Sequence, residues 1–113
     1  WVVAMDRWQR LTNLKITASA LDDVAEHAGE LLVHAADVEG RQEGVDIELV
    51  SLLGEWGGRP VTYAGGARSI EDLDLVAEHS KGRVDLTIGS ALDIFGGTGA
   101  SYDECVAWNR RER

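Results

Sequence analysis

The stretch VTYAGGARSIEDL, residues 61–73, joins a β-branched run to an acidic helical pattern through two consecutive glycines. VTYA is typical of a buried strand. Ser69 stands at the expected N-cap of a helix, with Glu71 and Asp72 where their charge favours the positive end of the helix dipole. A strand, a glycine turn and a helix in direct succession form the unit from which parallel α/β folds are built. The turn either only reverses the chain or also leaves room for a ligand.

The same unit recurs on both sides of this stretch. Strands are predicted over residues 1–5, 31–38, 61–64 and 84–89, helices over 17–29, 46–56, 69–82 and 101–111, a short helical piece over 90–97, and an irregular or extended connection over 10–16. N-caps are expected at Thr17 or Ser19 and at Asp46, and Gly29 is expected to stop the first helix. This alternation with short connections predicts right-handed βαβ units around parallel strands.

Two architectures are built from such units, an open doubly wound sheet and a (β/α)8 barrel. A complete barrel usually needs roughly 250 residues, so three or four units would make about half of one. Each predicted strand ends in a loop of its own, HAADVEG (34–40), AGGARS (64–69) and IGSALDIFGG (88–97). These loops favour the half barrel, because barrel loops all face one mouth, and they lack the G-x-G-x-x-G turn of a Rossmann sheet. A four-strand sheet of this kind would leave an apolar edge, which another chain or segment is expected to cover.

Composition narrows the classes of function. The chain has 113 residues, 44% of them apolar, and a net charge of −9, which argues for one small domain and against nucleic-acid binding. The single Cys105 permits no internal disulfide, and the three histidines lie on different predicted elements, so no metal site is expected. The sequence shows neither a membrane-spanning run nor a signal peptide, so a cytoplasmic location away from membranes is expected.

Four small residues at two strand ends form a candidate phosphate site: Gly65, Gly66, Gly89 and Ser90. In phosphate-binding barrels the anion lies between the loops after strands seven and eight and the N-terminus of a short extra helix. The segment ALDIF (91–95) has the length of such a helix, and amides of residues without bulky side chains let phosphate oxygens approach. The alternative is a plain turn at the first pair and a helix cap at the second.

Four segments resemble a known enzyme family: LLVHAADVEG (31–40), VTYAGGARSIEDL (61–73), GRVDLTIGSALDIFGG (82–97) and YDECVAWN (102–109). They are similar to the C-terminal half of the eukaryotic phosphoribosylformimino-5-aminoimidazole carboxamide ribotide isomerases, which perform an Amadori rearrangement in histidine biosynthesis. The resemblance covers essentially the whole chain. It implies that residues 1–113 run from the segment after strand five through helix eight of a single (β/α)8 barrel. It also implies a substrate with a phosphate at each end, a reaction that needs no cofactor, and a monomeric complete enzyme.

The resemblance also implies where catalytic groups lie. The family uses aspartates at the ends of strands one and five as acid and base, so the first would belong to the missing N-terminal half-barrel and the second to residues just before Trp1. This half by itself is therefore expected to be inactive. Asp6 is a further candidate acid, although a loop carboxylate beside Arg7 is the simpler interpretation.

His34 is the leading catalytic candidate within the chain, with Asp37 as the second. His34 ends the predicted strand-six run, where bacterial members of the family have threonine. An imidazole there would bond a sugar hydroxyl or position an aspartate, and histidine suits proton transfer near neutral pH. The alternative is a histidine packed beneath its loop. Asp37 and Glu39 would orient substrate hydroxyls or remain solvated.

Two other functions fit the same pattern. One is a non-catalytic, flavodoxin-like module that binds a phosphorylated ligand. The other is the related cyclase of the same pathway, which shares the glycine loops but works with an ammonia-producing partner. The runs HAADVEG and DIFGG favour the isomerase.

Overall fold

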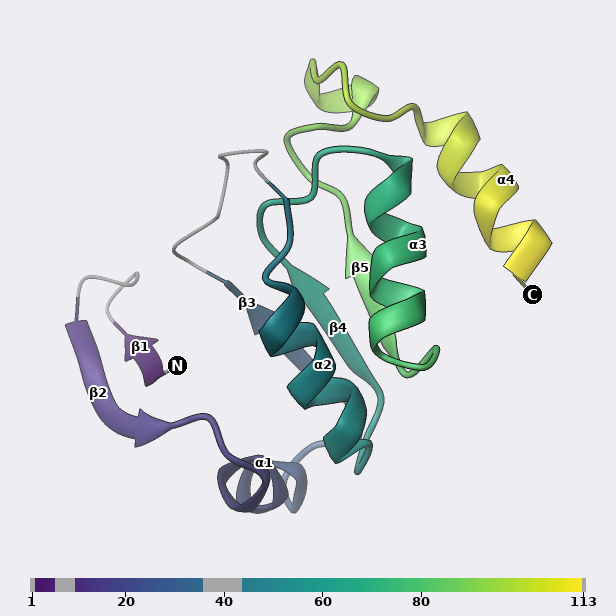
Figure 1. The fold of residues 1–113 in the computed structure, drawn as a ribbon. Coiled ribbons are helices and arrows are strands. Elements are labelled where there is room, and N and C mark those ends of the chain that lie inside the picture. The colour runs from purple at the N-terminus through teal and green to yellow at the C-terminus, as the bar shows by residue number, and fades with distance from the viewer. Residues whose placement is uncertain (1, 6–9, 36–43, 113) are drawn as a thin grey trace.

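The computed structural model describes residues 2–5, 10–35 and 44–112 (Figure 1). In chain order the elements are β1 (Val2–Met5), β2 (Arg10–Lys15), α1 (Ala18–Ala25), β3 (Leu31–His34), α2 (Ile47–Trp56), β4 (Val61–Ala64), α3 (Ile70–His79), β5 (Val84–Thr87), the short 3-10 helix η2 (Asp93–Phe95) and α4 (Tyr102–Glu112). From α1 onward, strands and helices alternate as predicted. None of the helices in these described ranges is long and apolar enough to cross a membrane.

The central sheet consists of three parallel strands in the order β3-β4-β5. Leu32 of β3 pairs with Thr62 of β4, which pairs with Asp85 of β5. Two residues further along each strand, His34, Ala64 and Thr87 lie side by side. The connecting helices α2 and α3 cover the same face of the sheet (Figure 1). A strand order that runs in one direction with helices on one face is that of a barrel segment. The described sheet has no reversal of strand order, which a flavodoxin-like site requires.

The N-terminal strands form a separate hairpin. β1 pairs with β2 in antiparallel orientation, and neither joins the parallel sheet. The expectation of a parallel sheet with four strands was therefore wrong, and the run expected to be an irregular or extended connection is mostly strand β2. The physical reason is that two extended runs close together in the chain can pair directly as a hairpin, whereas a parallel partner needs a long crossover.

The core lies between the sheet and its helices. Val61, Tyr63 and Val84 point from the strands toward α2 and α3, and each is at least 96% buried. They pack in one cluster with Leu21, Leu49, Val50, Leu53 and Val76. The alternate strand residues point to the opposite face, where Leu32 is 68% exposed. No helix within the described ranges covers that second face.

Local capping explains where two helices begin. The Thr17 hydroxyl accepts the N–H of Ala20 at 3.1 Å, and the Asp46 carboxylate accepts the N–H of Leu49 at 3.2 Å, so both predicted N-caps are confirmed. Ser69 occupies the N-cap position of α3 but makes no capping bond with its side chain. Helix α1 ends at Ala25, before Gly29, which is therefore not its C-cap.

Helices α2 and α3 approach closely at Gly54. A Cβ atom at Gly54 would lie 2.6 Å from the Cα of Ser80, so only glycine allows this spacing. The buried Ser80 hydroxyl donates to the carbonyl of Val76 at 2.6 Å and accepts the N–H of Val84 at 3.2 Å. Arg83 donates from Nη1 to the carbonyl of Gly54 at 3.0 Å. The turn between α3 and β5 is thereby fixed against α2.

Two tryptophans join consecutive helices through carboxylates. Trp56 of α2 donates from Nε1 to Asp22 of α1 at 2.8 Å, and Trp108 of α4 donates to Asp74 of α3 at the same distance. The helix segments that carry these aspartates, LDDVAEH (21–27) and LDLVAEH (73–79), differ at a single position. Trp56 and Trp108 therefore each connect two helices. The same arrangement thus recurs in the first and second pairs of helices.

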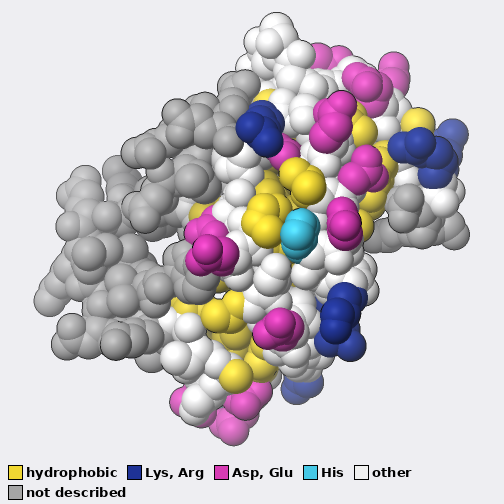
Figure 2. Space-filling model, viewed as in Figure 1, with side chains coloured by type: hydrophobic (Ala, Val, Ile, Leu, Met, Phe, Trp, Pro, Cys, Tyr) yellow, Lys and Arg dark blue, Asp and Glu magenta, His cyan; other side chains and the backbone are white. Residues whose placement is uncertain are grey.

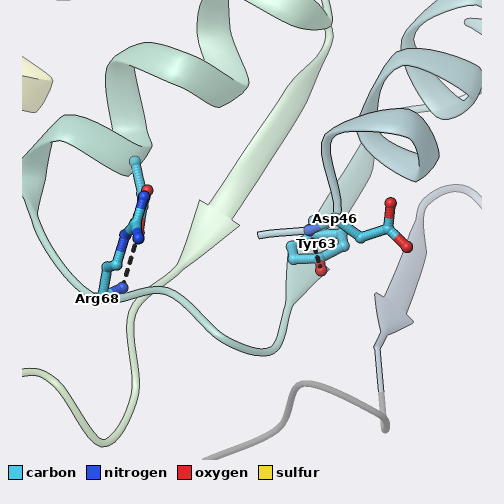
Figure 3. Close-up of polar contacts among 4 residues, drawn as sticks. Asp46, Tyr63 and Arg68 are labelled. Atoms are coloured by element: carbon cyan, nitrogen blue, oxygen red, sulfur yellow. Dashed lines mark hydrogen bonds and ion pairs between the residues drawn. The ribbon is translucent and has the colours of Figure 1, made fainter. Parts of the chain in front are cut away.

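Tyr63 connects the sheet to the start of α2. Its side chain is fully buried, and its hydroxyl accepts the backbone N–H of Asp46 at 3.0 Å (Figure 3). The bond fixes the N-cap residue of α2 over the centre of the sheet.

Replacing Tyr63 with phenylalanine removes this acceptor and keeps the ring. We expect the free energy of unfolding to fall by about 1 kcal/mol, since the part-buried N–H of Asp46 loses its partner. Urea unfolding followed by circular dichroism measures the change, with Tyr102→Phe as control, because Tyr102 is 55% exposed. Equal stability of the two variants would show that the Tyr63 hydroxyl contributes nothing.

Candidate functional site

The carboxyl ends of three parallel strands meet at one edge of the sheet. His34 ends β3, Ala64 ends β4 and Thr87 ends β5, and the register places these residues in one row. All three belong to the face away from α2 and α3, on which His34 and Thr87 are exposed. Because ligands of parallel α/β folds bind at the carboxyl ends of the strands, this edge is the candidate site.

The glycine pair after β4 is buried and has a backbone conformation that requires glycine. Gly65 has φ +120° and Gly66 has φ +80°, conformations that other residues rarely adopt. A Cβ atom at Gly65 would lie 2.6 Å from the carbonyl oxygen of Ala35, at the end of β3. The carbonyl of Gly66 accepts the N–H of Gly44 at 2.9 Å. The pair is thus held between the end of β3 and the start of the segment that leads into α2.

The amide groups of this loop matter for binding. Gly66 and Ala67 are buried, yet within the described part of the chain neither backbone N–H makes a hydrogen bond. Buried N–H groups are nearly always paired in folded proteins. Successive amides that lack partners in a turn are an arrangement that binds anions. The loop therefore offers two donors to an anionic group.

The loop after β5 lies beside this one, because Thr87 pairs with Ala64. Gly89 and Ser90 are both exposed, and the carbonyl of Gly89 accepts the N–H of Leu92 at 2.9 Å. The extra helix predicted over 91–95 is shorter than expected, a single 3-10 turn over Asp93–Phe95. The physical reason is that Asp93 is bonded elsewhere: its N–H donates to the carbonyl of Ala100 at 2.9 Å and its carboxylate accepts the N–H of Tyr102 at 2.9 Å.

Three residues at this edge escaped the sequence analysis as site residues. Thr87 lies beside Ala64 on the face of His34, and the period-two alternation of VDLT was the signal that could have placed it there. Arg68 and Asp72 flank the start of α3. The N–H of Arg68 donates to Asp72 Oδ2 at 2.8 Å, and Arg68 Nε lies 3.7 Å from Asp72 Oδ1 (Figure 3).

Three candidates from the sequence, Asp6, Asp37 and Glu39, lie outside the described residues. The structure brings the other five together at one edge of the sheet: His34, Gly65, Gly66, Gly89 and Ser90. Within the ranges that the structure describes, no group of three or more His, Cys, Asp or Glu side chains could hold a metal ion. An open groove of about 210 Å³ between α3, β5 and α4 contains none of these candidates.

Acidic side chains predominate on the helix face. Asp and Glu side chains are spread over the helix face, with Lys and Arg in few places (Figure 2). At the start of α3, hydrogen bonds from the Ser69 hydroxyl and from its own backbone N–H lower the pKa of Glu71. Partial burial raises the pKa of the Cys105 thiol on α4. The helix face is therefore unfavourable for anions, and the glycine loops are the better place for one.

Comparison with known proteins places this arrangement in a family. Residues 2–97 match the protein family described as "Histidine biosynthesis protein". The chain belongs to this family. Proteins of the family are (β/α)8 barrels, so β3, β4 and β5 with their helices are consecutive units of a barrel, and the fold predicted from the sequence is confirmed.

Relatives within the family are closely similar. A protein of Yarrowia lipolytica is 54% identical over 115 residues, covering 98% of this chain and 44% of the relative. Proteins of Neurospora crassa and Saccharomyces cerevisiae are 52% and 47% identical, each covering 99% of this chain and 44% of the relative. All three are named as isomerases of an imidazole-4-carboxamide that carries two 5-phosphoribosyl groups. The chain spans less than half the length of these relatives.

Proposed function

We propose that this chain forms part of an isomerase in histidine biosynthesis that converts a bis-phosphorylated aminoimidazole carboxamide ribotide from its aldose to its ketose form. The support is the close similarity to relatives named for this reaction over nearly the whole chain. The remaining part of the barrel, which this chain does not contain, is the expected partner. It would cover the exposed face of β3, β4 and β5.

In this proposal the glycine loops hold one phosphate of the substrate. The observation that carries it is the pair of buried amides of Gly66 and Ala67, which make no hydrogen bond within the described part of the chain. Gly89 and Ser90 follow the neighbouring strand β5, and both are exposed. A phosphate bound by backbone amides needs no basic side chain, which fits a chain of net charge −9.

His34 and Thr87 lie at the same edge, where they are the last residues of β3 and β5 before the loops begin. Both are exposed on the face that would become the barrel interior. Their hydrogen-bonding groups suit them to bind sugar hydroxyls of the substrate as its ring opens. Asp37 follows β3 and is proposed to assist there, while the main acid and base belong to the remaining barrel. With the phosphate held in the loops, the reacting carbons of the sugar are positioned over this row.

A chimeric barrel tests the proposal. The aligned 115 residues of the Yarrowia lipolytica relative are replaced by this chain, and the product is expressed in a yeast strain that lacks its own isomerase. We expect growth without histidine and isomerase activity in the purified chimera. The unaltered relative is the positive control. A folded chimera that binds the substrate without converting it would overturn the proposal and favour a binding module.

Gly89→Asp tests the phosphate site in this chimera. A Cβ atom at Gly89 meets no atom within 4 Å, so the fold tolerates the side chain, but its charge opposes the phosphate. We expect KM to rise at least tenfold, about 1.4 kcal/mol of binding, with a smaller change in kcat. Gly29→Asp is the matched control, because Gly29 is equally open and lies at the opposite end of β3. An equal KM in both variants would place the phosphate elsewhere.

A further inference from the structure

Asp72 is buried, which is unusual for a charged residue in the first turn of a helix. Its side chain is fully buried, although the carboxylate could face solvent at this position. One oxygen, Oδ2, accepts the N–H of Arg68 at 2.8 Å. The other, Oδ1, is buried and has no hydrogen-bond partner in the described part of the chain. The guanidinium of Arg68 lies beside it, with Nε 3.7 Å away.

This arrangement costs free energy. A buried carboxylate loses its hydration, and a single ion pair with a half-exposed arginine compensates for this only in part. The field at the start of α3 adds a further favourable contribution. A helix that needed only a cap could use the Ser69 side chain at the surface. Asp72 therefore points to a function beyond starting the helix.

Arg68 lies where the loops after β3, β4 and β5 meet. Its guanidinium covers Gly44, where an added Cβ atom would lie 3.2 Å from Cζ. Its carbonyl oxygen lies so close to Gly99 that a Cβ there would collide with it. Gly44 in turn donates its N–H to the carbonyl of Gly66 at 2.9 Å. A change at Arg68 is thus transmitted to the loops on both sides.

Two bonds fix the peptide planes on either side of Ala67. The plane between Gly66 and Ala67 is fixed through the Gly66 carbonyl, and the plane between Ala67 and Arg68 is fixed through the N–H that Asp72 accepts. Since a trans peptide is planar, its N–H points opposite to its carbonyl. The first bond therefore sets the direction of the Ala67 N–H, and the bond to Asp72 holds the following peptide plane, so that Ala67 is anchored on both sides.

We infer that Asp72 is a positioning residue of the phosphate loop, which holds Arg68 so that the amides of Gly66 and Ala67 face the phosphate. The inference rests on the proposed function, because it assigns a task within that phosphate site. Asp72 does not touch the substrate. It acts through the backbone of Arg68, and the guanidinium of Arg68 lies beside the buried carboxylate.

The test uses the full chain within the chimeric barrel, with inorganic phosphate as a competitive probe. Asp72→Asn keeps the shape of the side chain and removes its charge. We expect KM and the inhibition constant of phosphate to rise together about tenfold, with kcat changed less than threefold. Asp74→Asn is the matched control: the same change on the same helix, at an exposed carboxylate that binds Trp108. It should leave both constants unchanged.

Opposite outcomes separate the possible failures. If Asp72→Asn lowers the urea midpoint but leaves KM and phosphate inhibition unchanged, Asp72 is only structural and the inference is overturned. If Asp72→Asn does not fold, Arg68→Met takes over the test, since that side chain is 52% exposed. Unchanged phosphate inhibition in Arg68→Met would overturn the inference as well. If the unaltered chimera is inactive and phosphate does not bind to it, the proposed function has failed instead.

Discussion

Gly65→Ala is expected to lower the free energy of unfolding by about 3 kcal/mol or more, through backbone strain and a clash with main-chain atoms. At φ +120° a residue with a Cβ is strained wherever it is placed, and here the Cβ would lie 2.6 Å from the carbonyl oxygen of Ala35. That carbonyl cannot move easily, because the N–H of Ala35 is bonded to Ala64 at 2.8 Å. Urea unfolding followed by circular dichroism measures the loss.

Gly89→Ala is the control for this experiment. It lies at the end of the neighbouring strand, but an added Cβ meets nothing within 4 Å. Its stability should stay within about 0.5 kcal/mol of the parent, as for most surface substitutions. If Gly65→Ala were as stable as Gly89→Ala, the loop after β4 would not have the conformation described.

Gly54→Ala is expected to destabilise the protein although alanine is the better helix former. In an exposed helix this change would stabilise by about 1 kcal/mol. At Gly54 the new Cβ would lie 2.6 Å from the Cα and 2.9 Å from the carbonyl oxygen of Ser80. Overpacking against backbone costs about 3 kcal/mol, so we expect a net loss of about 2 kcal/mol. Thermal and urea unfolding both measure it.

The sign of the change makes this prediction decisive. Gly29→Ala is the matched comparison, because its Cβ would meet no atom within 4 Å. That variant should be neutral or slightly more stable. A Gly54→Ala protein more stable than the parent would mean that α2 and α3 are further apart than described.

The fold could be predicted from the sequence wherever the signal is local. Thr17 and Asp46 cap their helices as predicted, because a side chain that bonds an amide three residues ahead depends on neighbours in the chain alone. The pairing of β2 with β1 could not be predicted, because the run Arg10–Lys15 has no alternation that distinguishes a hairpin strand from an extended connection. Gly29 was misplaced as a stop, since α1 ends earlier at Ala25.

The site could be predicted in outline and not in detail. Glycines at two adjacent strand ends were visible in the sequence, and the register of β4 with β5 brings them together. The burial of Asp72 was not visible. A carboxylate in the first turn of a helix looks the same in sequence whether it faces water or the core. Whether the Asp72 carboxylate faces water or the core depends on where the tertiary structure places the backbone of Arg68, whose N–H this carboxylate accepts.

The hydrogen bonds of Trp56 and Trp108 make the intrinsic tryptophan fluorescence of the chain a probe of helix packing. Trp56 and Trp108 each bond to an aspartate of the preceding helix, so each indole ring reports on a different pair of helices. With Trp1 and Trp8 replaced by phenylalanine, variants that keep only one of the two would emit from a single place in the fold. Their fluorescence during refolding would show whether the two halves of this segment assemble in one step or in succession.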